Sequence, residues 1–135
     1  MYVIKTPIND PTAPFWTMHH QKTMYGGKGI TTNDTIFVFA DENEGGQGLL
    51  ALGRITSAKA TPRNPSLERQ TPRVSVTIQR LAIANGRLGR AELKAFSDWS
   101  DGRPETELNF KSYRQATNKI GGVSQKAATF LRGFF

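Results

Sequence analysis

The stretch "GGKGITTNDTIFVFADENEGGQGLLALGRITSA", residues 26–58, predicts a β-hairpin around which the rest of the chain is organised. Residues 35–39 are apolar on both faces and rich in β-branched and aromatic side chains, which is typical of a strand buried on both sides. Residues 49–55 are the expected return strand, and Gly53 within it indicates a bulge or a close backbone approach. The acidic residues between the strands are expected at a solvated tip: Asp41, Glu42 and Glu44.

The segments that flank this hairpin add strands and a long connection. Residues 2–5 form a short apolar run that is expected to be the first strand, and residues 16–25 can form either a short helix or an ordered loop. Residues 61–73 contain three prolines and are long for a connection in a compact domain, which is typical of functional or mobile loops. Beyond them, apolar and polar residues alternate over residues 74–83, as in a half-buried strand.

The last part of the chain predicts helices. A short helix is expected within residues 88–96, with Leu93 and Phe96 inward, and residues 97–107 are expected to be a loop. Ser112 and Ser124 can each cap a further helix, because apolar positions recur after them at helical spacing. The inward positions of these two helices are Tyr113, Ala116, Thr117 and Ile120 in the first, and Ala127, Phe130, Leu131 and Phe134 in the second.

Length and composition set the broad class. The 135 residues correspond to one domain, expected to span residues 1–135, with one hydrophobic core. The strands and helices together predict an α+β fold, a small and mostly antiparallel β-barrel with short flanking helices, two of them C-terminal. The chain has no cysteine, no signal-peptide pattern and no run of roughly 18 apolar residues, so we expect a cytoplasmic protein without a membrane partner.

The charge distribution favours a polyanionic partner. The formal net charge is +7 and the sequence pI is about 10.1, which is typical of domains that bind nucleic acid. The positive residues concentrate in two segments, residues 59–80 and residues 111–135, and the second of these contains no acidic residue. The expected phosphate-binding residues are Lys59, Arg63, Arg69, Arg73 and Lys119.

Patterns for catalysis, metal binding or cofactor binding are lacking in the sequence. Residues 26–29, "GGKG", do not have the ending of a phosphate-binding loop and predict a turn. His19 and His20 are adjacent, so on a regular strand their rings would point to opposite faces, and a metal site would need distant carboxylates. We therefore expect no metal, no cofactor and no enzymatic activity.

The hairpin carries a resemblance to a known superfamily. Residues 27–41, "GKGITTNDTIFVFAD", and residues 48–58, "GLLALGRITSA", resemble the central strands of PUA-like domains, with Asn33-Asp34 at the turn where Gly-Asp is typical. The small and apolar positions of the second strand match as well, namely Gly48, Ala51, Gly53 and Ile55. Trp16 stands about where EVE and YTH domains, members of that superfamily, have a tryptophan. The resemblance covers about half of the chain and has no counterpart for the C-terminal helices.

This resemblance implies binding of RNA or DNA, with an unpaired or modified base held in an aromatic pocket. A base in such a pocket needs aromatic stacking partners and polar groups at its edge. The expected base-binding residues are Trp16, Phe15, His19, His20, Tyr25, Asn33 and Trp99, with Trp16 as the principal stacking residue. Tyr113, Gln21 and Asn118 are further candidates, and Trp16 and Trp99 can instead be packing residues.

Three alternatives remain open at the level of sequence. "NKIGGVSQKAATFL" is similar to the turn and second helix of a DNA-binding helix-turn-helix, which would then span residues 112–133. The apolar C-terminus "FLRGFF" suits a protein-interaction module or a homodimer interface. An enzyme similar to ASCH domains would use one lysine and one acid that spacing does not reveal.

Overall fold

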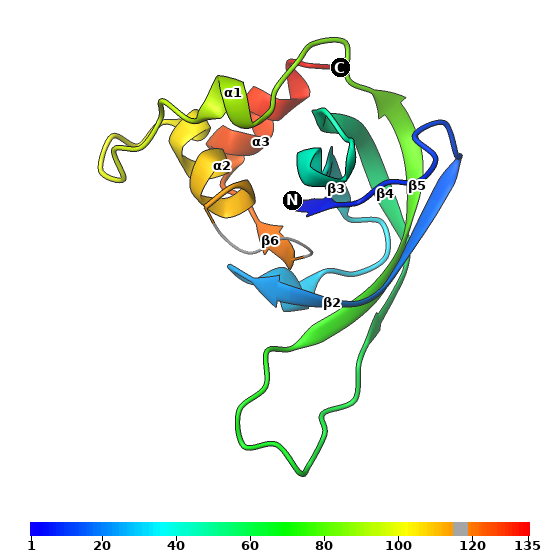
Figure 1. The fold of residues 1–135 in the computed structure, drawn as a ribbon. Coiled ribbons are helices and arrows are strands. Elements are labelled where there is room, and N and C mark those ends of the chain that lie inside the picture. Colours follow the sequence, from blue (N-terminus) through cyan, green and yellow to red (C-terminus); the bar gives the residue numbers. More distant parts are fainter. Residues whose placement is uncertain (115–118) are drawn as a thin grey trace.

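The computed structural model describes residues 1–114 and 119–135, apart from the side chain of Glu44. Its strands close into a barrel in the order β1-β3-β4-β5-β2-β6, and Figure 1 shows the helices gathered on one side of it. The strands are β1 (Tyr2–Thr6), β2 (Phe15–Met24), β3 (Thr35–Ala40), β4 (Gly48–Ala60), β5 (Arg73–Ile83) and β6 (Lys119–Gly122). The helices are α1 (Arg90–Leu93), α2 (Pro104–Ser112) and α3 (Gln125–Arg132), with short 3-10 turns η1 (Gly27–Gly29) and η2 (Glu42–Glu44).

The barrel is mixed: most neighbouring strands are antiparallel, as predicted from sequence, but two pairs are parallel. Strand β1 runs parallel to β3, and β2 runs parallel to β6, whereas the other neighbours are antiparallel. A parallel pair needs a crossover of about a dozen residues or more. Residues 7–34 supply this crossover between β1 and β3, because they contain the whole of β2.

The central hairpin forms as predicted, and its two buried faces have separate partners. In β3, Ile36 and Val38 belong to the core inside the barrel, whereas Phe37 and Phe39 pack between the barrel and the helices. Both expectations for Gly53 are confirmed, since the pairing register with β5 shifts there and a Cβ atom would lie 2.4 Å from Ile78 Cγ2.

Strand β2 replaces the short helix or loop expected over residues 16–25. Trp16 and Met18 are buried in the barrel interior, whereas Thr17 and His19 between and after them are exposed, which is the alternation of a strand. A register shift between Met18 and Gln21 interrupts the pairing with β5. The pairing of β2 with β5 is therefore irregular at the two histidines, His19 and His20.

The C-terminal part differs most from expectation. The helix α2 begins at Pro104, within the expected loop, and ends at Ser112, where a helix was expected to begin. Ile120 lies in strand β6 instead of on a helix, and Ala116, Thr117 and Asn118 lie outside the described residues. Because β6 is a barrel strand, residues 112–133 do not form a helix-turn-helix, and that alternative is wrong.

The last helix was predicted correctly. The Ser124 hydroxyl accepts a hydrogen bond from the Ala127 backbone nitrogen at 3.1 Å, as an N-cap residue does. Leu131 and Ala127 are buried, and Phe130 and Phe134 pack against the same core. Within the described residues, every helix is too short or too polar to cross a membrane.

Candidate nucleic-acid interface

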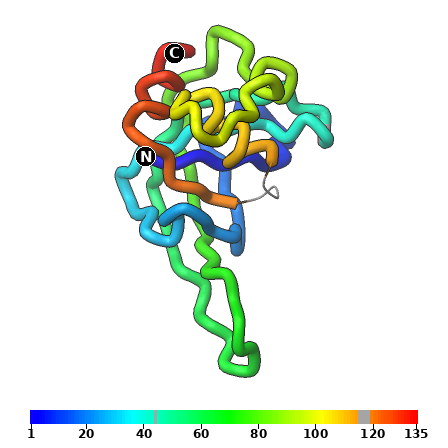
Figure 2. Tube along the Cα trace, turned by 90° about the vertical axis from the view of Figure 1, so that its left-hand side faces the viewer, coloured from blue at the N-terminus to red at the C-terminus, as the bar shows by residue number. Residues whose placement is uncertain are grey.

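A basic finger projects from the barrel where β4 and β5 continue beyond their neighbours. We define it as residues 59–73, which include the end of β4, the connection and the first residue of β5. Ladder pairing persists as far as Ala60 and Val74, and the Thr61 nitrogen then donates to the Arg73 carbonyl at 2.8 Å. Figure 2 shows that this segment extends well away from the rest of the molecule.

The tip of the finger is ordered by its own polar side chains. Gln70 Oε1 accepts from the Asn64 backbone nitrogen at 2.9 Å, and its amide donates to the Leu67 carbonyl at 3.2 Å. Arg63 Nη2 donates to the Glu68 carbonyl at 3.0 Å. These bonds close a compact loop whose shape does not depend on the barrel.

The finger brings together four of the five residues predicted to bind phosphate. All four are exposed: Lys59, Arg63, Arg69 and Arg73. Arg73 Nη1 donates to the His20 carbonyl at 3.0 Å, whereas Arg69 has no hydrogen bond or ion pair to any described residue. Together with Lys22 on β2, Arg63, Arg69 and Arg73 line a pocket of about 390 Å³ at the base of the finger.

The two histidines lie in an adjoining cleft of about 360 Å³, which Lys59 also lines. Their rings lie on the same side rather than on opposite faces, with centroids 6.3 Å apart, because the strand irregularity gives His20 a φ of 53°. His20 Nδ1 is 2.8 Å from Thr61 Oγ1, a hydrogen bond that joins β2 to the finger. The histidines are therefore neighbours of the basic residues and not of the aromatic ones.

A separate pocket brings together Tyr25 and Trp99, and we call it the aromatic pocket. It has a volume of about 370 Å³, and Arg103, Glu107 and Lys111 also line it. Tyr25 follows the end of β2 with a left-handed φ of 51°, a backbone conformation that costs free energy in residues other than glycine. Trp99 comes from the loop between α1 and α2, which the sequence analysis expected to be irregular.

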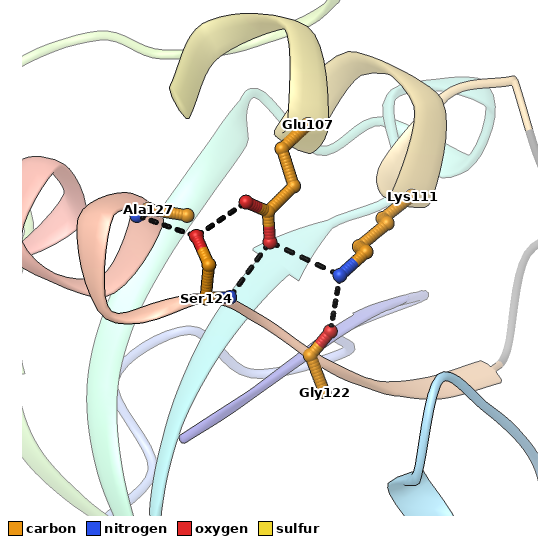
Figure 3. A network of polar contacts seen from close by, with 5 residues as sticks. All are labelled: Glu107, Lys111, Gly122, Ser124 and Ala127. Carbon is orange, nitrogen blue, oxygen red and sulfur yellow. Dashed lines mark hydrogen bonds and ion pairs between the residues drawn. The ribbon is translucent and has the colours of Figure 1, made fainter. Parts of the chain in front are cut away.

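Two residues that line the aromatic pocket, Glu107 and Lys111, belong to a hydrogen-bonded network (Figure 3). Lys111 Nζ lies 3.0 Å from Glu107 Oε2 and donates to the Gly122 carbonyl at 2.8 Å. Glu107 also accepts hydrogen bonds from the backbone nitrogen and the hydroxyl of Ser124. Desolvation raises the pKa of Glu107, but the bonds from Ser124 and Lys111 outweigh it and hold the pKa below its ordinary value.

Strand β6 connects the finger with the aromatic pocket. Lys119, the fifth predicted phosphate-binding residue, pairs with Lys22, and two residues later Gly121 pairs with Met24. Tyr25 comes next along β2 and belongs to the aromatic pocket. The basic and aromatic parts thus follow each other along β2.

The remaining residues of the predicted base-binding set lie apart from both pockets. Trp16 is 8% exposed, packs in the barrel interior and donates from Nε1 to the Asp10 carbonyl at 2.9 Å. Phe15 is 49% exposed at the start of β2. Asn33 lies at the turn before β3, and its backbone nitrogen donates to the Ile55 carbonyl at 2.7 Å. A base-binding role for these three residues stays a prediction.

A buried lysine is the main feature that sequence analysis missed. Lys5 is 5% exposed, and its ammonium group donates no hydrogen bond to a described residue. Its Nζ lies 4.5 Å from the centroid of the Tyr113 ring. Desolvation lowers the pKa of Lys5, and attraction to Asp41 and Glu42 opposes that effect in part. Nothing in the apolar run of residues 2–5 distinguishes this lysine from a solvated one.

Two of the acidic residues expected at a solvated tip, Asp41 and Glu42, are instead in contact with the rest of the fold. Asp41 is buried, and Glu42 Oε1 accepts from the Tyr113 hydroxyl at 2.7 Å and from the Arg90 nitrogen at 2.8 Å. Burial raises the pKa of Tyr113, and the hydrogen bond to Glu42 raises it further. Glu42 therefore fastens the hairpin to the helices, whereas the side chain of Glu44 lies outside the described residues. No three His, Asp or Glu side chains of the described residues gather as metal ligands would.

Comparisons with known proteins find relatives only at the level of structure. No family model and no curated protein sequence matches the chain. The DUF55 domain of human thymocyte nuclear protein 1 superposes with a TM-score of 0.64 at 14% identity, covering 98% of this chain and 96% of that one. Human THYN1 protein in complex with DNA containing 5-methylcytosine gives a TM-score of 0.66 at 15% identity, covering 98% and 95%.

A bacterial structure is similar to the same degree. A protein from Pseudomonas putida has a TM-score of 0.61 at 12% identity, with 98% of this chain and 97% of that chain covered. These likenesses extend over the C-terminal helices and β6, where the sequence resemblance had no counterpart. At such low identity they define the architecture alone. The chain therefore has a PUA-like fold, the fold of the DUF55 domain of human thymocyte nuclear protein 1.

Proposed function

We propose that this protein is a non-catalytic nucleic-acid-binding domain whose basic finger contacts the phosphate backbone. The observation that supports this most directly is the gathering of Lys59, Arg63, Arg69 and Arg73 on one exposed projection. Lys22 and Lys119 extend the same positive surface onto the barrel. Such an array attracts phosphates from any sequence, because neutralising them releases condensed counterions.

A finer part of the proposal is that the protein binds an unpaired or modified base. One structural neighbour, human THYN1, was solved in complex with DNA containing 5-methylcytosine, and it has the same architecture. The present chain also places two solvent-accessible aromatic side chains, Tyr25 and Trp99, at one pocket. Affinities measured for DNA and RNA strands of the same sequence identify the preferred partner.

The salt dependence of binding tests the role of the finger. We expect the affinity for oligonucleotides to fall steeply as salt rises from about 50 to 200 mM. Replacing Arg63, Arg69 and Arg73 together by Ala should flatten the slope of log K against log salt, because each lost phosphate contact removes about 0.7–0.9 from it. Fluorescence anisotropy at several salt concentrations measures this slope.

Two further variants make the result interpretable. Arg69→Ala removes a charge that bonds to no described residue, so it lowers the slope without changing the shape of the finger. Arg87→Ala removes the same charge from the connection between β5 and α1, outside the finger, where Arg87 is exposed, and should leave the slope unchanged. An unaltered slope in the triple variant would reject the finger as the phosphate-binding surface.

A further inference from the structure

Trp99 is held in an exposed position by the structure around it. It is the most exposed large apolar side chain of the described residues, at 64%. Its loop is fixed by Asp98, which accepts hydrogen bonds from the Ser100 nitrogen at 3.1 Å and from the Ser100 hydroxyl at 2.8 Å. Phe110 supports the indole edge-on, with ring centroids 4.7 Å apart. A fixed aromatic ring that is left open to solvent is suited to stacking with a ligand.

The aromatic pocket offers this ligand both space and a second ring. Its volume of about 370 Å³ is within the range of about 300–1,000 Å³ that is usual for small-molecule sites. Tyr25, which also lines the pocket, is 43% exposed, and Lys111 Nζ lies 4.6 Å from its ring centroid. One planar ring system is the group that this arrangement accommodates best.

The charges of the pocket narrow the class of ligand. Arg103 and Lys111 are cationic, and the one acidic lining residue, Glu107, already accepts hydrogen bonds from Lys111 and Ser124. A cationic ligand such as a methylated lysine would be repelled, whereas a neutral aromatic group attached to an anionic backbone is attracted. A nucleobase in a single strand has this combination of properties.

The position of the pocket fits the path of such a strand. At a rise of about 3.3 Å per residue, Tyr25 lies roughly 10 Å along β2 from Lys22, which lines the pocket at the base of the finger. Lys119 pairs with Lys22 and adds a second positive charge between the two pockets. Phosphates bound there would leave the following base close to Trp99.

We infer that the aromatic pocket binds one unpaired nucleobase of a single strand, stacked on Trp99, with Arg103 and Lys111 at its rim. This inference rests on the proposed nucleic-acid-binding function and assigns the base to a specific site. Trp16, the principal stacking residue expected from sequence, then acts only in packing.

Affinity measurements on variants test the stacking. Trp99→Ala should weaken binding of a short single-stranded oligonucleotide by about 5- to 150-fold, the loss expected for one stacked base, with an unchanged salt slope. Trp99→Phe should retain much of the affinity, because it keeps an aromatic face. Leu81→Ala removes another exposed large apolar side chain, on β5, that lines neither pocket, and it should bind like the wild type.

Tryptophan fluorescence gives an independent readout. The chain has two tryptophans, and Trp16 is buried, so quenching on addition of a base-containing strand should come from Trp99 and be absent in Trp99→Phe. An abasic strand of equal length supplies the phosphates alone and should bind weakly without quenching.

The outcomes separate this inference from the proposed function. Salt-dependent binding in which Trp99→Ala matches the wild type, without quenching, would overturn the pocket assignment and leave the finger in place. Absence of oligonucleotide binding by the wild type would overturn both.

Discussion

Burial in the fold makes the positive charge of Lys5 energetically unfavourable. Its ammonium is buried and donates no hydrogen bond to the described residues, so the charged form is poorly stabilised. The nearby carboxylates of Asp41 and Glu42 reduce this cost without removing it, since the pKa of Lys5 is lowered overall. The folded state therefore favours the neutral amine more than the unfolded state does.

The predicted consequence is that Lys5→Met stabilises the protein at neutral pH. The midpoint of thermal unfolding should rise by roughly 3–5 °C, the shift produced by about 1 kcal/mol in a domain of this size. The gain should shrink as the pH rises from the lowered pKa of folded Lys5 towards the ordinary 10.5, because there the wild type loses the buried charge.

Calorimetry between neutral and alkaline pH measures this difference. Lys28→Met replaces an exposed lysine and should leave the midpoint unchanged. A less stable Lys5→Met variant at neutral pH would mean that attraction to the carboxylates outweighs desolvation. The prediction would then be wrong.

At the scale of elements, Glu107 fastens α2 to the start of α3 and, through Lys111, to β6 (Figure 3). Glu107→Gln should lower the free energy of unfolding at pH 7 by about 1.5–3 kcal/mol, the range for hydrogen bonds to a charged group. Glu105→Gln on the same helix, whose side chain makes no contact of this kind with the described residues, should have little effect.

The pH dependence of this effect has a definite sign. The folded state lowers the pKa of Glu107, so its contribution to stability is complete above the ordinary value of 4.5 and is lost as the pH falls through the lower folded pKa. Wild type and Glu107→Gln should therefore converge in acid. Denaturant unfolding at several pH values tests this, and a difference that persists in acid would contradict it.

Elements with strong local signals could be predicted from sequence, and those that depend on tertiary contacts could not. The hairpin of β3 and β4 has long apolar strands, and Ser124 caps α3 through a neighbour in its own turn. In α2 the buried positions include polar residues, and Asn109 Nδ2 donates to the Phe96 carbonyl at 3.0 Å. No apolar periodicity indicates such a helix.

Strand β6 was missed for a related reason. Its sequence, KIGG, has a low intrinsic preference for strands. Glycine is required at position 122 by packing, because a Cβ atom on Gly122 would lie 2.3 Å from the Tyr25 carbonyl oxygen. That close approach involves a residue almost one hundred positions away in the chain, which local patterns do not report.

For surface exposure of the predicted site residues, charge was a better guide than aromatic character. Exposed arginines in a long proline-containing connection indicated the finger, because charged side chains remain at the surface in nearly every fold. The sequence gives no comparable criterion that separates Trp16 in the core from Trp99 at the surface. The register of β2 determines that Trp16 is buried, and the loop before α2 determines that Trp99 is exposed.

At the scale of the whole molecule, we expect the barrel to fold without the outer part of the finger. Replacing residues 62–71 by Asn-Gly should leave the thermal midpoint nearly unchanged, since this dipeptide suits a tight hairpin and shortens the loop. Thr61 and Pro72 are kept because they bond to His20 and Thr23 of β2. Oligonucleotide affinity should fall, whereas Trp99 should still respond to free nucleosides at high concentration.

A large loss of stability in this deletion variant would show that the finger supports the barrel. Circular dichroism melts distinguish that outcome from a selective loss of binding. Loss of the nucleoside response with an intact fold would show that the finger shapes the aromatic pocket.

The strand order also constrains how the chain is synthesised. Strand β6 lies between β1 and β2, the two earliest strands, and comes last of the six. While the ribosome is still translating the residues before Lys119, β1 and β2 each have an unpaired edge, and unpaired edges are sites of aggregation. The nascent barrel stays open until nearly its whole length has emerged, so chaperone demand should be highest late in translation.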